Sequence, residues 1–247
     1  MIIGSSTTVF SQLNIELMRK DDDVNGVFNT VSLYSDFETG NTEYLEIASS
    51  YRIDWNHEDF YTFINSYLKY KESDFDVKSN RGYIHWRFVL EVDNFIQPEI
   101  FVQKEFDKFL DITDRNVIGG GARFKLFQTK KDTTSKSKFT LNAGIGLMWE
   151  KESFIEEIPN TKIFRSTNYV SFRWIINSYL KIIAGLYFQA DIKRIKDNRV
   201  YFDSDIIIKL TDFLSLTSNI HYRYDNEPPW TIKYYDFEIV SGISLNF

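Results

Sequence analysis

The 247-residue sequence contains no cysteine, only four prolines and only eleven glycines. The absence of cysteine excludes disulfide bonds and thiolate metal sites such as iron–sulfur clusters. Basic residues are also in the minority, because 29 Lys and Arg stand against 35 Asp and Glu and the net charge is −6. This acidic balance argues against a nucleic-acid partner, which requires a basic surface.

Long apolar runs are missing as well. No stretch of the sequence approaches the roughly 18 uncharged apolar residues that mark a membrane-spanning helix. A membrane β-barrel escapes this test, because every second residue of its strands faces a polar lumen. Aromatic residues, in contrast, are abundant: 17% of the chain, with 22 Phe and 15 Tyr. Such side chains favour either a β core or the boundary between membrane and water.

The end of the chain, 233–247, alternates between apolar and polar residues. Its apolar set includes Phe237, Ile243, Leu245 and the terminal Phe247. A period of two indicates a strand with one apolar and one polar face. Similar segments of around ten residues recur along the chain, and this is the length that a tilted strand needs to cross a bilayer. The expected strands are 27–37, 43–55, 60–71, 81–91, 95–106, 115–127, 138–150, 165–175, 179–191, 199–210, 213–224 and 233–247.

The connections between these segments alternate in length. Short turns are expected at 92–94 and 176–178 and long loops at 72–79 and 151–163, although the polar stretch 128–137 breaks the alternation. Short periplasmic turns and longer extracellular loops are typical of an outer-membrane barrel. One face of the segments also carries many charges, which a dry core could not hold unpaired.

We therefore predict an all-β fold: a transmembrane antiparallel up-and-down β-barrel of about 12 strands over residues 27–247. The alternative is a large soluble β-barrel or sandwich. Residues 1–26 form an N-terminal lead-in, in which 1–11 could be the remnant of a secretion signal.

Three stretches carry a resemblance to a known family. They contain Gly40-Asn41-Thr42, then Asp107 with Arg115 and the glycines 119–121, then Pro228-Pro229 with Lys233, Asp236 and Phe247. In this order, over about 27–247, they resemble the outer-membrane barrel family known as domain of unknown function 481, the salt-stress-induced outer membrane protein type. The resemblance implies the outer membrane of a Gram-negative cell. The apolar terminus of Phe237, Ile243, Leu245 and Phe247 is similar to the signal that barrel-assembly machinery reads. The family implies no catalytic residue and no cofactor.

The residues themselves predict no enzyme and no metal site. The three histidines, His57, His85 and His221, have no metal-ligand spacing. A barrel lipase needs a serine activated by a histidine, but Arg87 and Arg223 stand two residues after His85 and His221. We interpret the glycines 119–121 as strand residues that permit bending or close approach, because the Lys-Ser/Thr of a phosphate-binding loop does not follow them.

Charged residues on the inward faces are expected to form a network in the lumen. The candidates are Arg81, Arg87, Glu99, Glu105, Arg123 and Arg173. A three-residue turn at 92–94, with Asn94 in the left-handed conformation, would place Arg87 opposite Glu99 and Arg81 opposite Glu105.

The functional hypothesis is a porin-like barrel with a narrow polar lumen that passes or binds small solutes. The alternative is a plugged structural or partner-binding barrel in an outer-membrane complex. The expected partners are outer-membrane lipid, the assembly machinery during biogenesis, and other outer-membrane proteins that contact loop 151–163 or the lead-in.

Overall fold

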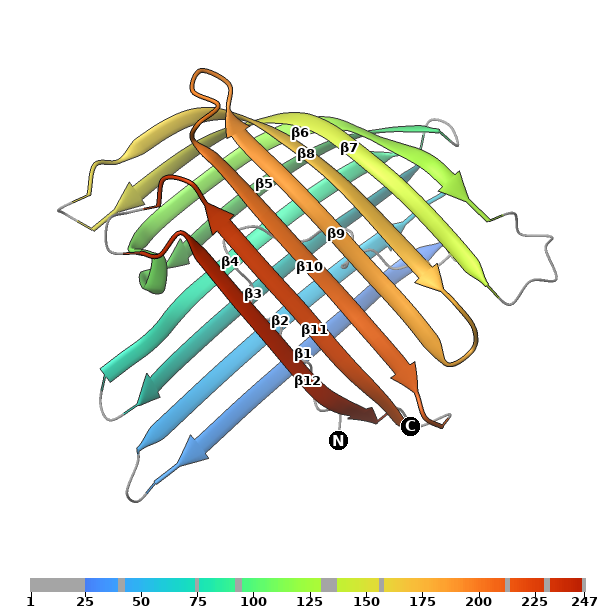
Figure 1. Cartoon of the computed structure of the whole chain (residues 1–247), viewed down its shortest axis with the longest axis horizontal. Helices are drawn as coiled ribbons and strands as arrows, with labels where there is room; N and C mark the ends of the chain where they lie inside the picture. The colour runs from blue at the N-terminus through green and yellow to red at the C-terminus, as the bar shows by residue number, and fades with distance from the viewer. Residues whose placement is uncertain are drawn as a thin grey trace.

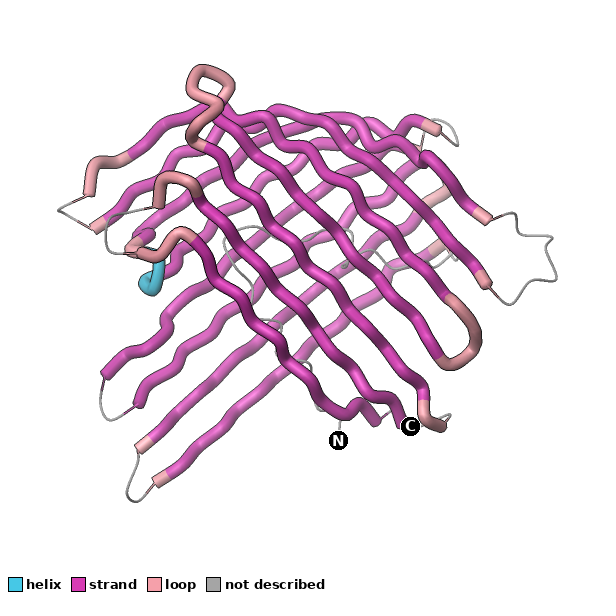
Figure 2. The backbone as a smooth tube through the Cα atoms, viewed as in Figure 1, coloured by secondary structure: helices cyan, strands magenta, loops and turns pink. Residues whose placement is uncertain are grey.

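The chain forms one antiparallel sheet that follows the order of the sequence. The computed structural model describes residues 25–39, 43–73, 76–91, 95–129, 137–155, 158–211, 214–228 and 232–245. Within these residues the sheet has twelve strands, each paired with the next, and one short 3-10 helix (Figures 1 and 2). The predicted all-β, up-and-down architecture is confirmed, and every strand overlaps one of the twelve expected segments.

The elements are β1 (Gly26–Glu38), β2 (Tyr44–Asn56), β3 (Phe60–Ser73), β4 (Asp76–Leu90), β5 (Ile96–Asp107), η1 (Lys108–Leu110), β6 (Ile112–Gln128), β7 (Lys138–Phe154), β8 (Thr161–Ile175), β9 (Leu180–Asp191), β10 (Asn198–Lys209), β11 (Leu214–Asp225) and β12 (Tyr235–Leu245). Within the described part of the chain no helix is long and apolar enough to cross a membrane. The lead-in up to residue 24, Asn94 and Phe247 lie outside the described residues, so the expectations that concern them stay predictions.

The sheet is strongly curled. In Figure 1 the strands β1 to β4 slope one way behind the strands β9 to β12, which slope the other way in front, and β6 to β8 form the crest. Both terminal strands, β1 and β12, lie along the lower side of this view. Between the residues described for these two strands there is no pairing, so the sheet is curled and open rather than a closed barrel.

The two faces of the sheet differ in polarity. Along β2, Glu46, Arg52 and Asp54 point into the curl and are buried, whereas Ile47 and Trp55 point outward and are exposed. The same alternation extends over β3 to β11. Charged residues are almost never buried unless they are paired, and on the inner face Arg52 pairs with Asp54 at 2.6 Å. The predicted assignment of inward and outward residues is thus correct in these strands.

The predicted register of the β4–β5 hairpin is wrong by two residues. Arg87 lies opposite Phe101, and Glu99 lies opposite Val89. A shift by two keeps every side chain on its predicted face, since side-chain direction repeats every second residue. A three-residue turn would have placed Glu91 opposite Phe95, which this register excludes.

Two loops are shorter than expected. Strand β3 continues to Ser73 and β4 begins at Asp76, so most of the expected loop 72–79 is strand. Strand β7 likewise continues to Phe154 and β8 begins at Thr161, which reduces the expected loop 151–163 to residues 155–160. The added ends of β3 and β7, with Lys71 and Glu72 in one and Lys151 and Glu152 in the other, are charged and extend these strands beyond the apolar band.

Candidate functional site in the interior of the sheet

Glu150, near the end of β7, is the centre of a buried network of ion pairs. Its side chain is fully buried and accepts hydrogen bonds from three arginines. Arg115 Nε of the neighbouring β6 lies 3.0 Å from Oε2, and Arg165 Nε of the other neighbour, β8, lies 2.8 Å from Oε1. Arg199 Nη1 lies 3.1 Å from Oε1. Because Arg199 belongs to β10, three strands away, this contact crosses the interior.

The arginines link Glu150 to further carboxylates. Arg199 donates from Nη2 to Glu152 Oε2 at 3.0 Å and from Nε to Asp225 Oδ2 at 2.8 Å. Arg165 Nη1 lies 2.6 Å from Asp197 Oδ1. The arginine–carboxylate cluster comprises Glu105, Arg115, Glu150, Glu152, Arg165, Asp197, Arg199 and Asp225. Buried charges are tolerated only when they are paired in this way.

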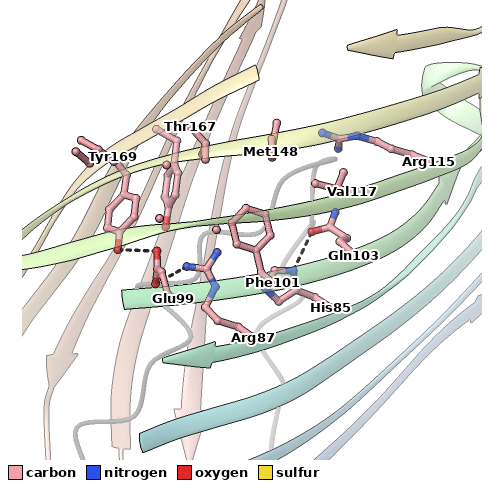
Figure 3. A pocket seen from close by; sticks show the side chains of 15 residues that line it. His85, Arg87, Glu99, Phe101, Gln103, Arg115, Val117, Met148, Thr167 and Tyr169 are labelled. Atoms are coloured by element: carbon pink, nitrogen blue, oxygen red, sulfur yellow. Dashed lines mark hydrogen bonds and ion pairs between the residues drawn. The ribbon is translucent and has the colours of Figure 1, made fainter. Parts of the chain in front are cut away.

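A second layer lies deeper along the strands (Figure 3). Arg87 Nη1 and Glu99 Oε2 are 2.8 Å apart, and both side chains are buried. Glu99 also accepts a hydrogen bond from the Tyr169 hydroxyl at 3.4 Å, and the Arg87 guanidinium lies 4.6 Å from the centre of the Phe101 ring. The predicted ion pair between Arg87 and Glu99 therefore exists, although the two residues are diagonal neighbours and not opposite each other.

Two of the histidines are packed or turn residues, whereas the buried His221 Nδ1 lies 2.6 Å from Asp203 Oδ1. The ring of His85 stacks between Phe63 and Phe101, with centroids at 5.8 and 6.1 Å, and its Nδ1 lies 3.0 Å from Gln103 Oε1. His57 accepts a hydrogen bond from the backbone N–H of Asp59 in the β2–β3 turn. In the described ranges no group of His, Asp and Glu is placed to hold a metal ion.

Bulky side chains occupy the space around this layer. Phe101, Val117 and Met148 pack together from β5, β6 and β7, and Tyr169 stacks on Tyr187 at 5.1 Å. The pocket between them, shown in Figure 3, leaves a cavity of about 20 Å³. A cavity of this size holds about one water molecule. Within this pocket the side chains of the protein leave little free space.

A comparison with protein families finds a match. The model of "Protein of unknown function, DUF481" matches residues 32–247, which include most of β1 and all the other strands. The chain belongs to this family. No curated protein matches the sequence.

The DUF481 chain brings together only part of the predicted network. Arg81 lies opposite Asp107, while Glu105 pairs with Arg115 at 3.2 Å. Arg123 Nη1 donates to Gln97 Oε1 at 2.6 Å. Arg173 points inward and is half-buried between Thr140 and Ile183. The proposed opposition of Arg81 and Glu105 is wrong, because the register differs by two residues.

The sequence analysis missed Glu150, Glu152, Arg165, Arg199 and Asp225 as members of the network. Their inward direction can be read from the alternation, but the contacts of Arg199 with Glu150 and Glu152 join β10 to β7, which are not neighbouring strands. Of the assembly-signal residues, Phe237 and Ile243 of β12 are exposed on the outward face of this DUF481 chain. Leu245 is the last residue of β12.

Proposed function

We propose that this DUF481 protein is a Gram-negative outer-membrane β-barrel whose interior is plugged by its own side chains. It would serve as a structural or partner-binding barrel and would not form an open solute channel or act as an enzyme. The outward face of β7 supports the membrane assignment. From Phe139 to Trp149 every outward residue is apolar. This run is roughly 34 Å long, and a tilt of about 40° reduces it to a height of about 26 Å, close to the ~25 Å band of membrane barrels.

Outward aromatic pairs at one rim support the same assignment. Trp55 packs against Phe60 beside the β2–β3 turn, with centroids 5.1 Å apart. Phe139 packs against Trp174 at 6.2 Å where β7 begins and β8 ends. Aromatic side chains are enriched where a membrane meets water. This rim would face the periplasm, because it carries the expected short turns.

Closure of the sheet is part of the proposal. Unpaired backbone groups at a sheet edge have no hydrogen-bond partner in hydrocarbon, so a spanning sheet closes on itself. An even number of strands makes β1 and β12 antiparallel. Their alternation is compatible with pairing, because Leu33 of β1 and Phe237 of β12 are both exposed on the outward face.

The side chains in the interior are the observation that supports a plugged barrel over an open channel. The arginine–carboxylate cluster and the layer around Phe101 and Met148 cross the space that a channel would need, and the described pocket between them has a cavity of about 20 Å³. The remaining working surfaces are the outer face, which contacts lipid, and the connections at the rim, such as 155–160. Partners there would be other outer-membrane proteins. The barrel-assembly machinery is expected as a partner during biogenesis.

Conductance in planar bilayers tests the plugged interior. We expect the wild-type chain to insert and to remain silent. The double variant Phe101→Ala/Met148→Ala removes two buried side chains from the central layer and should produce measurable conductance. The matched control Ile118→Ala/Leu147→Ala removes outward side chains from the same region and should stay silent. Steady channels of defined size in the wild type would contradict the plug and favour the solute channel.

A further inference from the structure

A row of lysines crosses the outward face of the sheet where the apolar band ends. In register, Lys104 of β5 lies opposite Asn116 of β6, Asn116 lies opposite Lys151 of β7, and Lys151 lies opposite Lys162 of β8. The lysine row is defined as Lys104, Lys151 and Lys162. All three side chains point away from the interior, and Lys104 and Lys162 are exposed.

The next outward positions along the same strands are apolar or aromatic. Val102, Ile118, Trp149 and Phe164 lie opposite one another in turn. The lysine row therefore lies one step beyond the apolar band, on the side of the connection 155–160. In a membrane this is the level of the lipid headgroups, where basic side chains meet phosphate groups.

Among the described residues, the carboxylate of Asp114 attracts both Lys104 and Lys151, so that it only partly balances the three charges of the row. Asp114 pairs with Lys104 at 2.8 Å and also accepts a hydrogen bond from Asn116. Within the described part of the chain, Lys151 and Lys162 form no ion pair, although they lie directly opposite each other. Like charges in this position destabilise a strand pair. An anion placed between the two ammonium groups would remove the repulsion and accept hydrogen bonds from both.

We propose that Lys151 and Lys162, with Lys104 beside them, bind the phosphate group of a membrane lipid headgroup. The lipid chains lie against Trp149 and Phe164, and the phosphate accepts hydrogen bonds from the lysine ammonium groups. This inference rests on the membrane assignment proposed above.

Lipid retention by the full chain tests the site. The protein is reconstituted in vesicles that contain phosphatidic acid or, as a phosphorus-free lipid, digalactosyldiacylglycerol, then extracted with detergent and weighed by native mass spectrometry. The wild type should retain phosphatidic acid in preference to the galactolipid. Lys151→Gln/Lys162→Gln should lower this retention roughly 30-fold, because each lysine near an anionic headgroup contributes about 1 kcal/mol of attraction and about 1.4 kcal/mol corresponds to a factor of ten. Lys151→Arg/Lys162→Arg should retain it.

The control is Lys193→Gln/Lys196→Gln, which removes the same charge from two exposed lysines of the β9–β10 connection. Equal losses in both Gln variants, or no loss in either, would overturn the lysine site. Complete displacement of the lipid by inorganic phosphate would assign the row to free phosphate and overturn the lipid. A wild-type chain that enters neither type of vesicle would overturn the membrane assignment together with the site, whereas normal insertion with unselective retention would overturn the site alone.

Discussion

At Gly121, the missing side chain is what lets β6 and β7 approach each other. Gly121 lies opposite Gly146, and a Cβ atom at position 121 would collide with the carbonyl oxygen of Ile145 and lie 2.7 Å from Gly146 Cα. These are backbone atoms, which cannot rotate away as a flexible side chain can. The interpretation of the glycine run 119–121 as a place of close approach is confirmed at this position.

Gly121→Ala should therefore destabilise the folded protein by about 1–3 kcal/mol, the usual cost of overpacking. Gly242→Ala is the matched control, since the nearest atom to a Cβ there is Thr217 Oγ1 at 4.0 Å. Its effect should stay within about 0.5 kcal/mol. Urea unfolding of both variants in vesicles measures the difference, and equal losses would contradict the close approach of the two strands.

A charge introduced on the outward face should lower the free energy of unfolding, and the loss should grow with the depth of the residue in the bilayer. Ile145 lies in the middle of the apolar run of β7 and is 58% exposed, and Ile155 follows the end of the same strand and is 40% exposed. Ile145→Arg should cost roughly 2–4 kcal/mol and Ile155→Arg about 0–1 kcal/mol, because the cost of arginine falls from the bilayer midplane to its surface. Unfolding free energies in vesicles give both values. A smaller loss at Ile145 than at Ile155 would argue against the membrane.

Among the elements, the β4–β5 hairpin shows how far the sequence is informative. The alternation in Ile84, Trp86 and Phe88 gives the correct outward face, because only one parity separates these apolar residues from the charged ones between them. The register depends on the length of the turn. Two turns whose lengths differ by two residues place every side chain on the same face, so the alternation cannot distinguish them. Parity was therefore predictable from this sequence, whereas register was not.

The Arg87–Glu99 pair should be strongly coupled. Both side chains are no more than 5% exposed, so water screens their attraction poorly. A double-mutant cycle with Arg87→Ala and Glu99→Ala should give a coupling energy of about 1–3 kcal/mol. The exposed pair Arg194 and Glu227, 2.6 Å apart, is the control and should give at most about 1 kcal/mol. If the coupling energy of the buried pair is no larger than that of the control pair, the interior ion pair is contradicted.

The arginine–carboxylate cluster could not be predicted from the hairpins. Arg115 and Arg165 belong to the strands on either side of Glu150, but Arg199 comes from β10. The contact between β7 and β10 depends on the curl and tilt of the whole sheet. These quantities arise from the summed twist of many strands and have no local sequence pattern.

At the scale of the whole molecule, the two terminal strands are the least buried elements. Val31 and Leu33 of β1 are 65% and 80% exposed, and Phe237 and Ile239 of β12 are 59% and 55% exposed. Exposed edges favour pairing with any other strand. The proposed pairing of β1 with β12 would satisfy both edges within one chain.

We predict that, in vesicles, the β1 amides that point away from β2 exchange hydrogen as slowly as the amides of β7. Closure gives each of them a carbonyl partner and removes them from water, and protection reports such bonds. Hydrogen exchange read by mass spectrometry compares the two strands, with the wild type in denaturant as the unprotected reference. Fast exchange confined to β1 and β12 would mean that the sheet stays open in the membrane.

The contact from Arg199 to Glu150 has a mechanical consequence. Hairpins of a simple up-and-down sheet can be pulled from a membrane one at a time, since each strand is held only by its neighbours. Here the ion pair between Glu150 and Arg199 joins β7 to β10 across the interior, and the ion pair between Arg199 and Asp225 joins β10 to β11. A force applied at the C-terminus would have to rupture these bonds before β10 could leave. The stretch from β6 to β11 should therefore yield as a single block, and the strands before it should follow pair by pair.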